Sequence, residues 1–336
     1  MDYRKLGASG IAVSPVCLGT MMFGGETDEG ESGRIIAAAR HAGVNIIDTA
    51  DVYNDGRSEE VVGRAIAANR DEWVLATKLG NRMGEGPNRA GLSRLWMFQA
   101  VDGSLRRLKT DRIDILYLHR EDLTTPLPVT VAAMGDLIAS GKVRHFGLSN
   151  FRAWRVAEVC ALCDRLGVPR PVVSQPYYNA MNRMPEVEHL PACGFYGLGV
   201  IAYSPLARGV LTGKYAPDAP PPEGTRAARH DKRIMESEWR PESLRIAQTL
   251  KRHAEARGTT PIAFAVAWVL HNALVTSTIA GPRTLAQFEG YLAALDYRFT
   301  AEDEALVNSL VPIGHPSSPG YNDPAYPLEG RPVRED

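Results

Sequence analysis

Four side chains that can donate or stabilise a proton follow short apolar runs of the sequence. Asp48 ends the run "NIID", Tyr53 follows shortly after it, Lys78 ends "WVLATK" and His119 ends "IDILYLH". An ammonium at the end of an apolar strand is costly without a carboxylate, which Asp48 on the neighbouring strand can supply. The ammonium of Lys78 would favour the phenolate of Tyr53 and lower its pKa. We therefore expect Tyr53 to be a proton donor near neutral pH.

Each of these side chains has an ordinary structural explanation when it is considered alone. An aspartate after a strand often stabilises a turn, a lysine is usually a solvated charge, and a histidine is often a satisfied core residue. These explanations weaken when all the residues occur at the ends of neighbouring strands. Asp51 belongs to the same stretch, "NIIDTADVYNDGRSEEVVG", and we expect it to stabilise the turn without taking part in the chemistry.

The apolar runs recur at intervals of roughly 30 residues, and each is followed by a helical pattern. The runs span residues 16–19, 45–48, 73–78, 113–119, 143–149, 171–175, 199–204 and 275–281. Several are apolar at nearly every position, as is typical of parallel strands buried on both faces. The pattern predicts an α/β fold, a (β/α)8 TIM barrel, in a single domain over residues 1–336. The loops after the strands of such a barrel share one face, where the strand-end residues would meet.

Local signals predict the ends of several helices and two irregular segments. Asp28 with Glu31 is expected to cap the first long helix, Ser93 the third, and Pro128 is expected in a first turn. An N-terminal β-hairpin is expected before the barrel and an extra helix near residues 301–311. The long segment 216–239 after the seventh strand predicts a functional loop. The tail, residues 312–336, is either disordered or folded over the barrel mouth.

Composition limits the class of partner. Of the 336 residues, 44% are hydrophobic and 23% are charged, as in ordinary globular proteins. The net charge of −1 provides no general basic surface for nucleic acid or anionic lipid, so we expect a small-molecule partner. No apolar run approaches the roughly 20 residues that span a bilayer, and the N-terminus lacks the apolar core of a secretion signal. The composition therefore predicts a cytoplasmic protein and leaves its oligomeric state open.

The four cysteines fit a reducing compartment. Cys160 and Cys163 form a C-x-x-C within an amphipathic helical pattern, and we expect both to be inert residues near its apolar face. The eight histidines form no metal-binding motif, so no metal is expected.

The sequence resembles the aldo-keto reductases over nearly its whole length, in particular a bacterial NADPH-dependent aldo/keto reductase. The resemblance rests on "LGTMMFGG", "DTADVYNDGRSEEVVG", "ATK", "LHR", "GLSN", "VSQPYYN", "YSPLARGVLTGKY" and "IAGPRTLAQFEG", which stand in the order and spacing of the family. It implies that Asp48, Tyr53, Lys78 and His119 form a catalytic tetrad. One departure is Tyr291, which stands where the family often has an asparagine that contacts adenine.

The resemblance also implies which residues contact the cofactor NADPH (NADP+) and the substrate. Tyr203 would stack on the nicotinamide, and Ser149, Asn150 and Gln175 would hold its carboxamide. The other implied cofactor-binding residues are Thr20, Met21, Ser204, Leu206, Arg208, Gly209, Leu211, Lys214, Gly281, Arg283 and Gln287. The walls of the substrate pocket are expected to include Met22, Phe23 and Arg120.

The resulting hypothesis is an NADPH-dependent oxidoreductase that reduces an aldehyde or a ketone to an alcohol. Hydride transfer to a carbonyl needs a proton donor close to its oxygen, a surface for the nicotinamide and fixed polar groups around it, and the sequence offers all three. Two alternatives remain open. One is a cofactor-binding regulatory subunit with weak reductase activity, and the other is a lyase or isomerase on the same barrel, because a fold alone does not determine chemistry.

Overall fold

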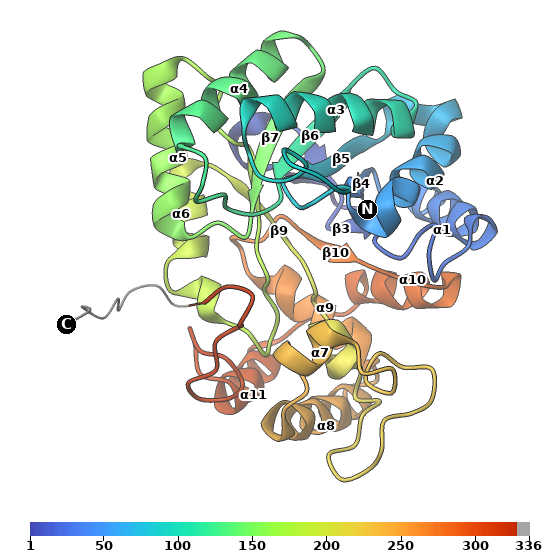
Figure 1. Ribbon diagram of the computed structural model, residues 1–336. Helices are drawn as coiled ribbons and strands as arrows, with labels where there is room; N and C mark the ends of the chain where they lie inside the picture. Colours follow the sequence, from blue (N-terminus) through green and yellow to red (C-terminus); the bar gives the residue numbers. More distant parts are fainter. Residues whose placement is uncertain (328–336) are drawn as a thin grey trace.

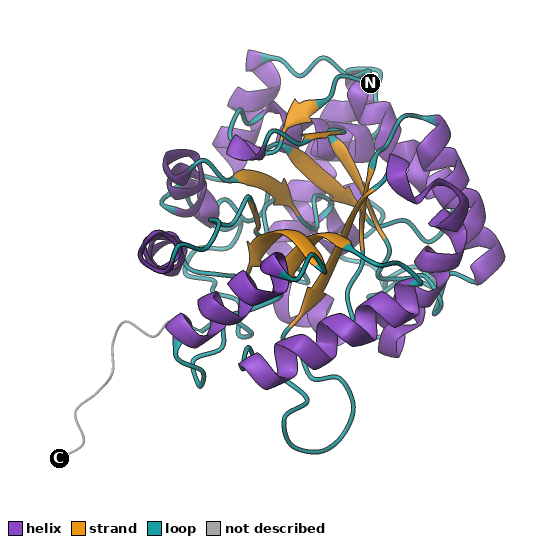
Figure 2. Cartoon of the chain, turned by 90° about the horizontal axis from the view of Figure 1, so that it is seen from above, coloured by secondary structure: helices purple, strands orange, loops and turns teal. Residues whose placement is uncertain are grey.

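Eight parallel strands form a closed barrel at the centre of the protein, whose computed structural model describes residues 1–327 (Figure 1). Around the barrel the strands follow the order β10-β3-β4-β5-β6-β7-β8-β9, and each hydrogen-bonds to its neighbours. Helices surround the strands, as the view from above shows (Figure 2). The predicted (β/α)8 barrel is confirmed, as is the N-terminal β-hairpin.

Every predicted strand run overlaps one strand of the barrel. The strands are β1 (Arg4–Lys5), β2 (Ala12–Val13), β3 (Val16–Gly19), β4 (Ile46–Asp48), β5 (Val74–Leu79), β6 (Ile113–Leu118), β7 (Val143–Ser149), β8 (Val173–Gln175), β9 (Gly199–Ala202) and β10 (Ser277–Ala280). The helices are α1 (Glu29–His41), α2 (Arg57–Ile66), α3 (Arg94–Leu108), α4 (Leu127–Ala139), α5 (Ala153–Leu166), α6 (His189–Tyr196), α7 (Lys232–Ser237), α8 (Pro241–Ala256), α9 (Pro261–His271), α10 (Leu285–Leu292) and α11 (Ala301–Leu310).

The antiparallel hairpin β1–β2 closes the N-terminal end of the barrel. Leu6 and Val13 are fully buried and belong to the hydrophobic cluster that fills the barrel interior. The backbone N–H of Ala8 donates to the carbonyl oxygen of Gly197 at 2.8 Å, just before β9 begins. The opposite end, where the strands finish, is therefore the end that can hold a site.

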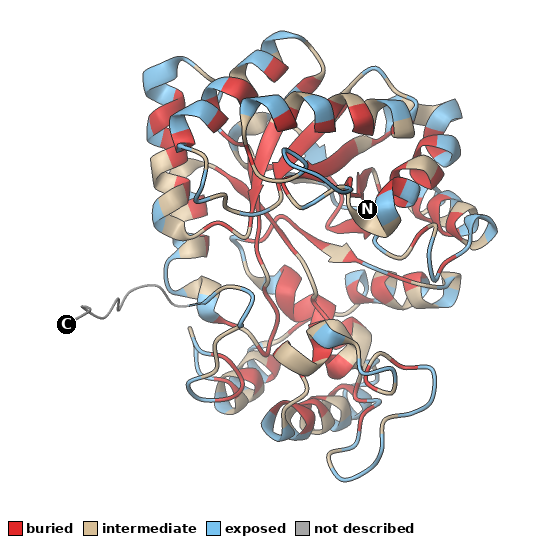
Figure 3. Ribbon diagram, in the orientation of Figure 1, coloured by how far each residue is buried: buried red, intermediate tan, exposed pale blue. Residues whose placement is uncertain are grey.

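Side chains alternate along each strand between the barrel interior and the layer under the helices. Most of the strand backbone is coloured as buried (Figure 3). In β5, Ala76 belongs to the interior cluster, whereas Leu75 and Leu79 belong to the outer cluster. The same alternation directs Lys78 into the barrel and Thr77 toward the helices. Strand direction and side-chain parity together therefore fix where a charged group at a strand end must lie.

The predicted helix caps agree with the structure, with one exception. The Asp28 side chain accepts a hydrogen bond from the backbone N–H of Glu31 at 2.8 Å, and Ser93 accepts one from Trp96 at 3.3 Å. Pro128 lies in the first turn of α4. Glu31 was expected to cap the same helix, but its carboxylate accepts from the backbone N–H of Leu285 at 2.6 Å. It therefore links α1 to the start of α10, which lies beside it.

The long segment after β9 and the described part of the tail pack against each other. Segment 216–239 contains the short helix α7, and Arg233 of this helix forms an ion pair with Asp323 of the tail at 2.6 Å. The backbone N–H of Ser317 donates to the carbonyl oxygen of Met181 at 2.8 Å, in the loop after β8. Residues 312–327 therefore fold over loops at the barrel mouth, the second of the two alternatives. The prediction for the rest of the tail lies outside the described residues.

Cys160 and Cys163 are fully buried free thiols on α5. Burial raises the pKa of Cys160 to about 11 and that of Cys163 to about 12, so both are protonated at neutral pH. Among residues 1–327, no helix combines the length and the apolar character needed to cross a membrane.

The crossing of α2 and α3 provides a test of the packing behind the site. A Cβ atom at Gly63 of α2 would lie 2.4 Å from the backbone oxygen of Leu108, so Gly63→Ala should lower the free energy of unfolding by about 1–3 kcal/mol. A Cβ atom at Gly33 of α1 meets nothing within 4 Å, and Gly33→Ala should raise it by about 0.5–1 kcal/mol. Urea unfolding measures both changes. Unchanged stability in Gly63→Ala would show that the close approach of the two helices is not required.

Candidate active site

A cavity of about 600 Å³ opens at the C-terminal ends of the barrel strands. Most of the predicted site residues line it, although they come from distant parts of the sequence. They are Thr20, Met21, Met22, Asp48, Tyr53, His119, Ser149, Asn150, Gln175, Tyr203, Ser204, Leu206, Arg208, Gly209, Lys214, Gly281, Arg283 and Gln287. The strand ends therefore meet on one face of the barrel.

Four predicted residues do not line the cavity. Lys78 is fully buried behind Asp48 and Tyr53. Phe23 and Leu211 are buried in the outer hydrophobic cluster, and Arg120 is exposed. Phe23 and Arg120, predicted in the substrate pocket, and Leu211, predicted as a cofactor contact, therefore do not line this cavity. All three follow strand ends, where the alternation of side chains no longer indicates their direction.

Lys78 is the centre of the polar network at the base of the cavity. Its Nζ atom contacts the Asp48 carboxylate and donates to the carbonyl oxygen of Thr49 at 2.8 Å and to the hydroxyl of Tyr53 at 3.0 Å. Gln175 donates to the other oxygen of Asp48 at 2.8 Å. Burial lowers the pKa of Lys78, but Asp48 and Tyr53 outweigh this effect and raise it. Lys78 is therefore an ammonium with three acceptors.

The phenol of Tyr53 is more weakly acidic than the sequence indicated. Burial raises the pKa of Tyr53 above its usual value, Lys78 lowers it, and Asp48 raises it again. The predicted influence of the ammonium is present, but the predicted net lowering of the pKa is wrong because burial outweighs it. Tyr53 is therefore fully protonated at neutral pH.

His119 lies across the cavity base from Tyr53. The two ring centroids are 5.9 Å apart and the ring planes meet at 81°. Burial, followed by the positive charges of Lys78 and Arg120, lowers the pKa of His119 well below its usual value. The imidazole is therefore neutral at neutral pH. A carbonyl oxygen at this end of the cavity would meet the Tyr53 hydroxyl and a neutral imidazole.

A second polar network connects the ends of β6 to β9. The hydroxyl of Tyr203 donates to the side-chain oxygen of Asn150 at 2.7 Å. The amide nitrogen of Asn150 donates to the backbone oxygen of His119 and to the hydroxyl of Ser149, both at 3.0 Å. These bonds fix an aromatic ring and several amide and hydroxyl groups in one wall of the cavity.

Cations gather in the part of the cavity formed by the segment after β9 and by the residues just before α10. Arg208, Lys214, Arg226 and Arg283 all line it, and Asp48, the one carboxylate of the described lining, is already paired with Lys78. Burial lowers the pKa of Lys214, and the charges of Arg283 and Arg226 lower it further. The one side-chain hydrogen bond of Arg226 within residues 1–327 goes to the Sδ atom of Met22, at 3.7 Å. Such mutually repelling cations suit a ligand with several negative charges.

A carboxylate from the loop after β3 also anchors the long loop. Glu26, in the loop after β3, accepts from Arg229 of the long loop at 3.0 Å and from Arg283 at 3.1 Å. Burial alone would raise the pKa of Glu26, but its bonds to the two arginines lower it. The bridge joins segments that are far apart in the sequence.

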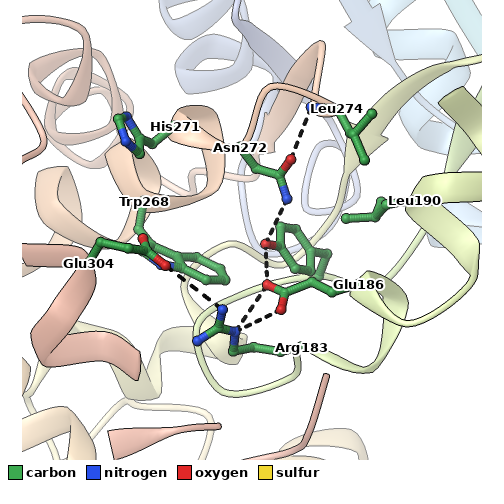
Figure 4. A pocket seen from close by; sticks show the side chains of 9 residues that line it. Arg183, Glu186, Leu190, Trp268, His271, Asn272, Leu274 and Glu304 are labelled. Atoms are coloured by element: carbon green, nitrogen blue, oxygen red, sulfur yellow. Dashed lines mark hydrogen bonds and ion pairs between the residues drawn. The ribbon is translucent and has the colours of Figure 1, made fainter. Parts of the chain in front are cut away.

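A smaller cavity of about 350 Å³ lies outside the barrel, beside α6, α9 and α11 (Figure 4). Its charged groups satisfy one another. The Arg183 guanidinium donates to Glu186 at 3.0 Å and lies over the Trp268 ring. Tyr178 donates to Glu186 at 2.7 Å and accepts from Asn272 at 3.1 Å. The larger cavity, where Arg208, Lys214 and Arg226 form no ion pair within residues 1–327, is therefore the candidate active site.

Sequence reasoning missed several lining residues, chiefly Arg226, Arg233 and Tyr326. Arg226 and Arg233 belong to the long loop, whose many arginines gave a signal without indicating which ones point inward. Tyr326 belongs to the tail, where no periodic pattern marks an inward side chain. Tyr291, at the position that departs from the family pattern, also lines the cavity. Within residues 1–327, no group of side chains is arranged to hold a metal ion.

Comparison with known proteins gives a consistent result. The profile of the Aldo/keto reductase family matches residues 15–312. A probable voltage-gated potassium channel subunit beta of Oryza sativa subsp. japonica is 38% identical over 301 residues, which cover 88% of this chain and 92% of the relative. The uncharacterized oxidoreductase YrpG of Bacillus subtilis (strain 168) is 35% identical over 323 residues, 93% of this chain and 96% of the relative.

A further relative is the L-glyceraldehyde 3-phosphate reductase of Escherichia coli O157:H7, which is 32% identical over 329 residues. That match covers 94% of this chain and 93% of the relative. The family profile and the similarity to these relatives extend over nearly the whole barrel, including the strand ends that form the cavity. The chain is therefore an oxidoreductase that belongs to the aldo/keto reductase family.

Proposed function

We propose that this protein reduces an aldehyde or a ketone to an alcohol with NADPH as the cofactor. The observation that carries the proposal is the hydroxyl of Tyr53, held 3.0 Å from the buried Lys78 ammonium in a cavity that also has unpaired cations. The first feature suits proton donation to a carbonyl oxygen, and the second suits a polyanionic cofactor.

The residues of the cavity fit a phosphorylated dinucleotide. Arg208, Lys214 and Arg226 would hold its phosphates, because none of them forms an ion pair with a carboxylate of residues 1–327. Arg283 precedes α10 by two residues, and its guanidinium would pair with a 2′-phosphate next to the helix N-terminus. Tyr203 and Asn150 would position the nicotinamide. When bound, the reduced nicotinamide would supply the hydride.

In the proposed reaction Tyr53 donates its proton to the carbonyl oxygen of the substrate. The phenolate that remains is stabilised by the ammonium of Lys78, and Asp48 keeps that ammonium in place. Neutral His119 would orient the carbonyl group from the other side. Met21, Met22, Val52, Asn81 and Tyr326 line the cavity and would form the wall around the substrate.

The names of some relatives support a second candidate, a cofactor-binding regulatory subunit with weak reductase activity. Related proteins of rice and of Arabidopsis thaliana are named probable voltage-gated potassium channel subunit beta. Steady-state oxidation of NADPH with a panel of reactive aldehydes separates the two functions. Rapid turnover supports the reductase, whereas tight NADPH binding with almost no turnover supports the regulatory subunit.

Tyr53→Phe tests the proton donor. The substitution keeps the ring but removes the proton, so single-turnover reduction should fall by roughly 10²-fold or more. NADPH affinity, measured by fluorescence, should barely change because the phenol is assigned no cofactor contact. Near-normal reduction by Tyr53→Phe would show that another group donates the proton.

Arg283→Ala tests the cofactor preference. Loss of a charge-assisted contact with the 2′-phosphate should weaken NADPH binding by roughly 10- to 100-fold. NADH lacks this phosphate, so its affinity serves as the internal control and should change much less. Equal losses for the two cofactors would remove Arg283 from the proposed phosphate site.

Glu26→Gln tests whether the long loop opens and closes. Without its carboxylate, Arg229 loses the bridge to the other side of the cavity, so a protease should cut between Pro217 and Arg240 faster than in the wild type. Saturating NADPH should slow the cut in both proteins. Cleavage at the same rate with and without NADPH would exclude a gating role for the loop.

A further inference from the structure

Asp51 is a buried carboxyl group that the proposed reaction does not use. It follows the end of β4, is fully buried, and its backbone N–H donates to the carbonyl oxygen of Lys78 at 3.1 Å. Neither of its carboxyl oxygens has a hydrogen-bond partner among the described residues. The expectation that its side chain stabilises the turn is therefore wrong. A buried polar group without partners requires a different explanation.

The neighbours of Asp51 explain why it has no counter-ion of its own. Glu59 of α2 is also fully buried, and its two oxygens accept from Thr77 of β5 and from Arg107 of α3, each at 2.6 Å. The arginine is therefore already engaged by Glu59. The ammonium of Lys78 is likewise committed to its own three acceptors. Asp51 and Glu59 therefore lie near a single guanidinium, that of Arg107, and Glu59 binds it.

These surroundings determine the charge of Asp51. Burial, followed by the negative charge of Glu59, raises the pKa of Asp51 to about 8, and Arg107 and Lys78 only partly offset these effects. Asp51 is therefore mostly neutral at pH 7 and ionises just above neutrality. A negative charge on Asp51 would in turn raise the pKa of Tyr53.

We propose that Asp51 is a positioning residue that acts through Tyr53 and Lys78, and that its ionisation slows carbonyl reduction. The neutral carboxyl group leaves the Lys78 ammonium free to stabilise the phenolate that forms on Tyr53. The ionised group opposes that effect and makes Tyr53 a weaker acid, so it donates its proton more slowly. This inference rests on the proposed role of Tyr53 and adds a pH range to it.

The pH range distinguishes Asp51 from the other groups of the site. Burial places the ionisation of Tyr53 above its usual range near pH 10, and that of His119 lies well below neutrality. A change in reduction rate around pH 8 therefore does not come from Tyr53 or His119, and Asp51→Asn tests whether it comes from Asp51. Outside the site, burial raises the pKa of Glu238 to about 7, which makes it a suitable control.

The main experiment measures single-turnover reduction of para-nitrobenzaldehyde by the NADPH-loaded protein from pH 6 to 10. In the wild type the rate should fall by about two- to tenfold, with a midpoint near the pKa of Asp51, about 8. Asp51→Asn mimics the neutral acid, so its rate should stay at the upper value over this range. Glu238→Gln should keep the wild-type step.

A second variant should shift the midpoint of the pH step in a direction that a purely structural role of Asp51 would not produce. Glu59→Gln removes the neighbouring negative charge and frees Arg107 to face Asp51, so the midpoint of the step should move to lower pH. This shift is measurable even if Asp51→Asn fails to fold. An unchanged midpoint in Glu59→Gln would contradict the proposed coupling.

Urea unfolding reports the charge of Asp51 without any reaction. Folding raises the pKa of Asp51 from 3.8 to about 8. Between these pH values Asp51 is ionised in the unfolded chain but protonated in the folded one, so the free energy of unfolding of the wild type falls as pH rises. Asp51→Asn lacks this penalty. The urea midpoint of Asp51→Asn should therefore exceed that of the wild type by a margin that is larger at pH 9 than at pH 4.

The outcomes separate this inference from the proposed function. A wild type that reduces the aldehyde at a constant rate from pH 6 to 10 overturns the role of Asp51 and leaves the reductase intact. A step that persists in Asp51→Asn also overturns it. A wild type without reduction at any pH contradicts the proposed function, and the inference with it.

Discussion

The candidate site depends on keeping a charged lysine inside the barrel. An ammonium without partners is expensive in such an environment, and removing one member of a buried ion pair typically costs about 3–5 kcal/mol. The structure meets this constraint with the carboxylate of Asp48, the backbone oxygen of Thr49 and the hydroxyl of Tyr53. Each partner comes from β4 or from the loop that follows it. The position of Tyr53 is thus a consequence of satisfying Lys78.

Charged side chains are paired in one part of the cavity and unpaired by carboxylates of residues 1–327 in another part. At its base, Lys78 and Asp48 neutralise each other, so a proton donor can lie beside them in a nearly neutral setting. Elsewhere in the cavity, Lys214 and the half-buried Arg226 form no ion pair with a carboxylate of residues 1–327, which favours an incoming anion. The smaller cavity outside the barrel shows the contrast, because Arg183 and Glu186 satisfy each other there. The cations of the larger cavity that form no ion pair within residues 1–327 therefore lie where an anionic ligand can supply one.

The barrel could be predicted from the regular recurrence of apolar runs along the sequence. The site residues at the strand ends could be predicted from their position at the end of these runs. Asp48 and Lys78 lie at the ends of apolar strands, and alternation decides that both point inward. The directions of Phe23 and Leu211 could not be predicted, because they lie in loops where no alternation applies. The pKa of Tyr53 was misjudged for a different reason. The sequence indicates a nearby ammonium, but the extent of burial depends on how the surrounding loops enclose the ring.

Contacts that a single side chain makes with a distant segment also could not be predicted from the sequence. Tyr326 reaches the cavity because the tail packs on loops more than a hundred residues earlier, and nothing in its local sequence indicates this. The unpaired state of Asp51 likewise depends on Arg107, which arrives from α3 and binds Glu59 instead. Such features arise from competition among partners in three dimensions.

The hairpin that closes the N-terminal end of the barrel has a kinetic consequence. Leu6 and Val13 are buried in the interior below Lys78, and the cavity has its opening at the strand ends. In the proposed reaction, Tyr53 must regain its proton after each turnover, and that proton has to arrive through the same mouth by which the alcohol leaves. Product release and recovery of the acid therefore share one route, and an alcohol that lingers in the mouth delays both.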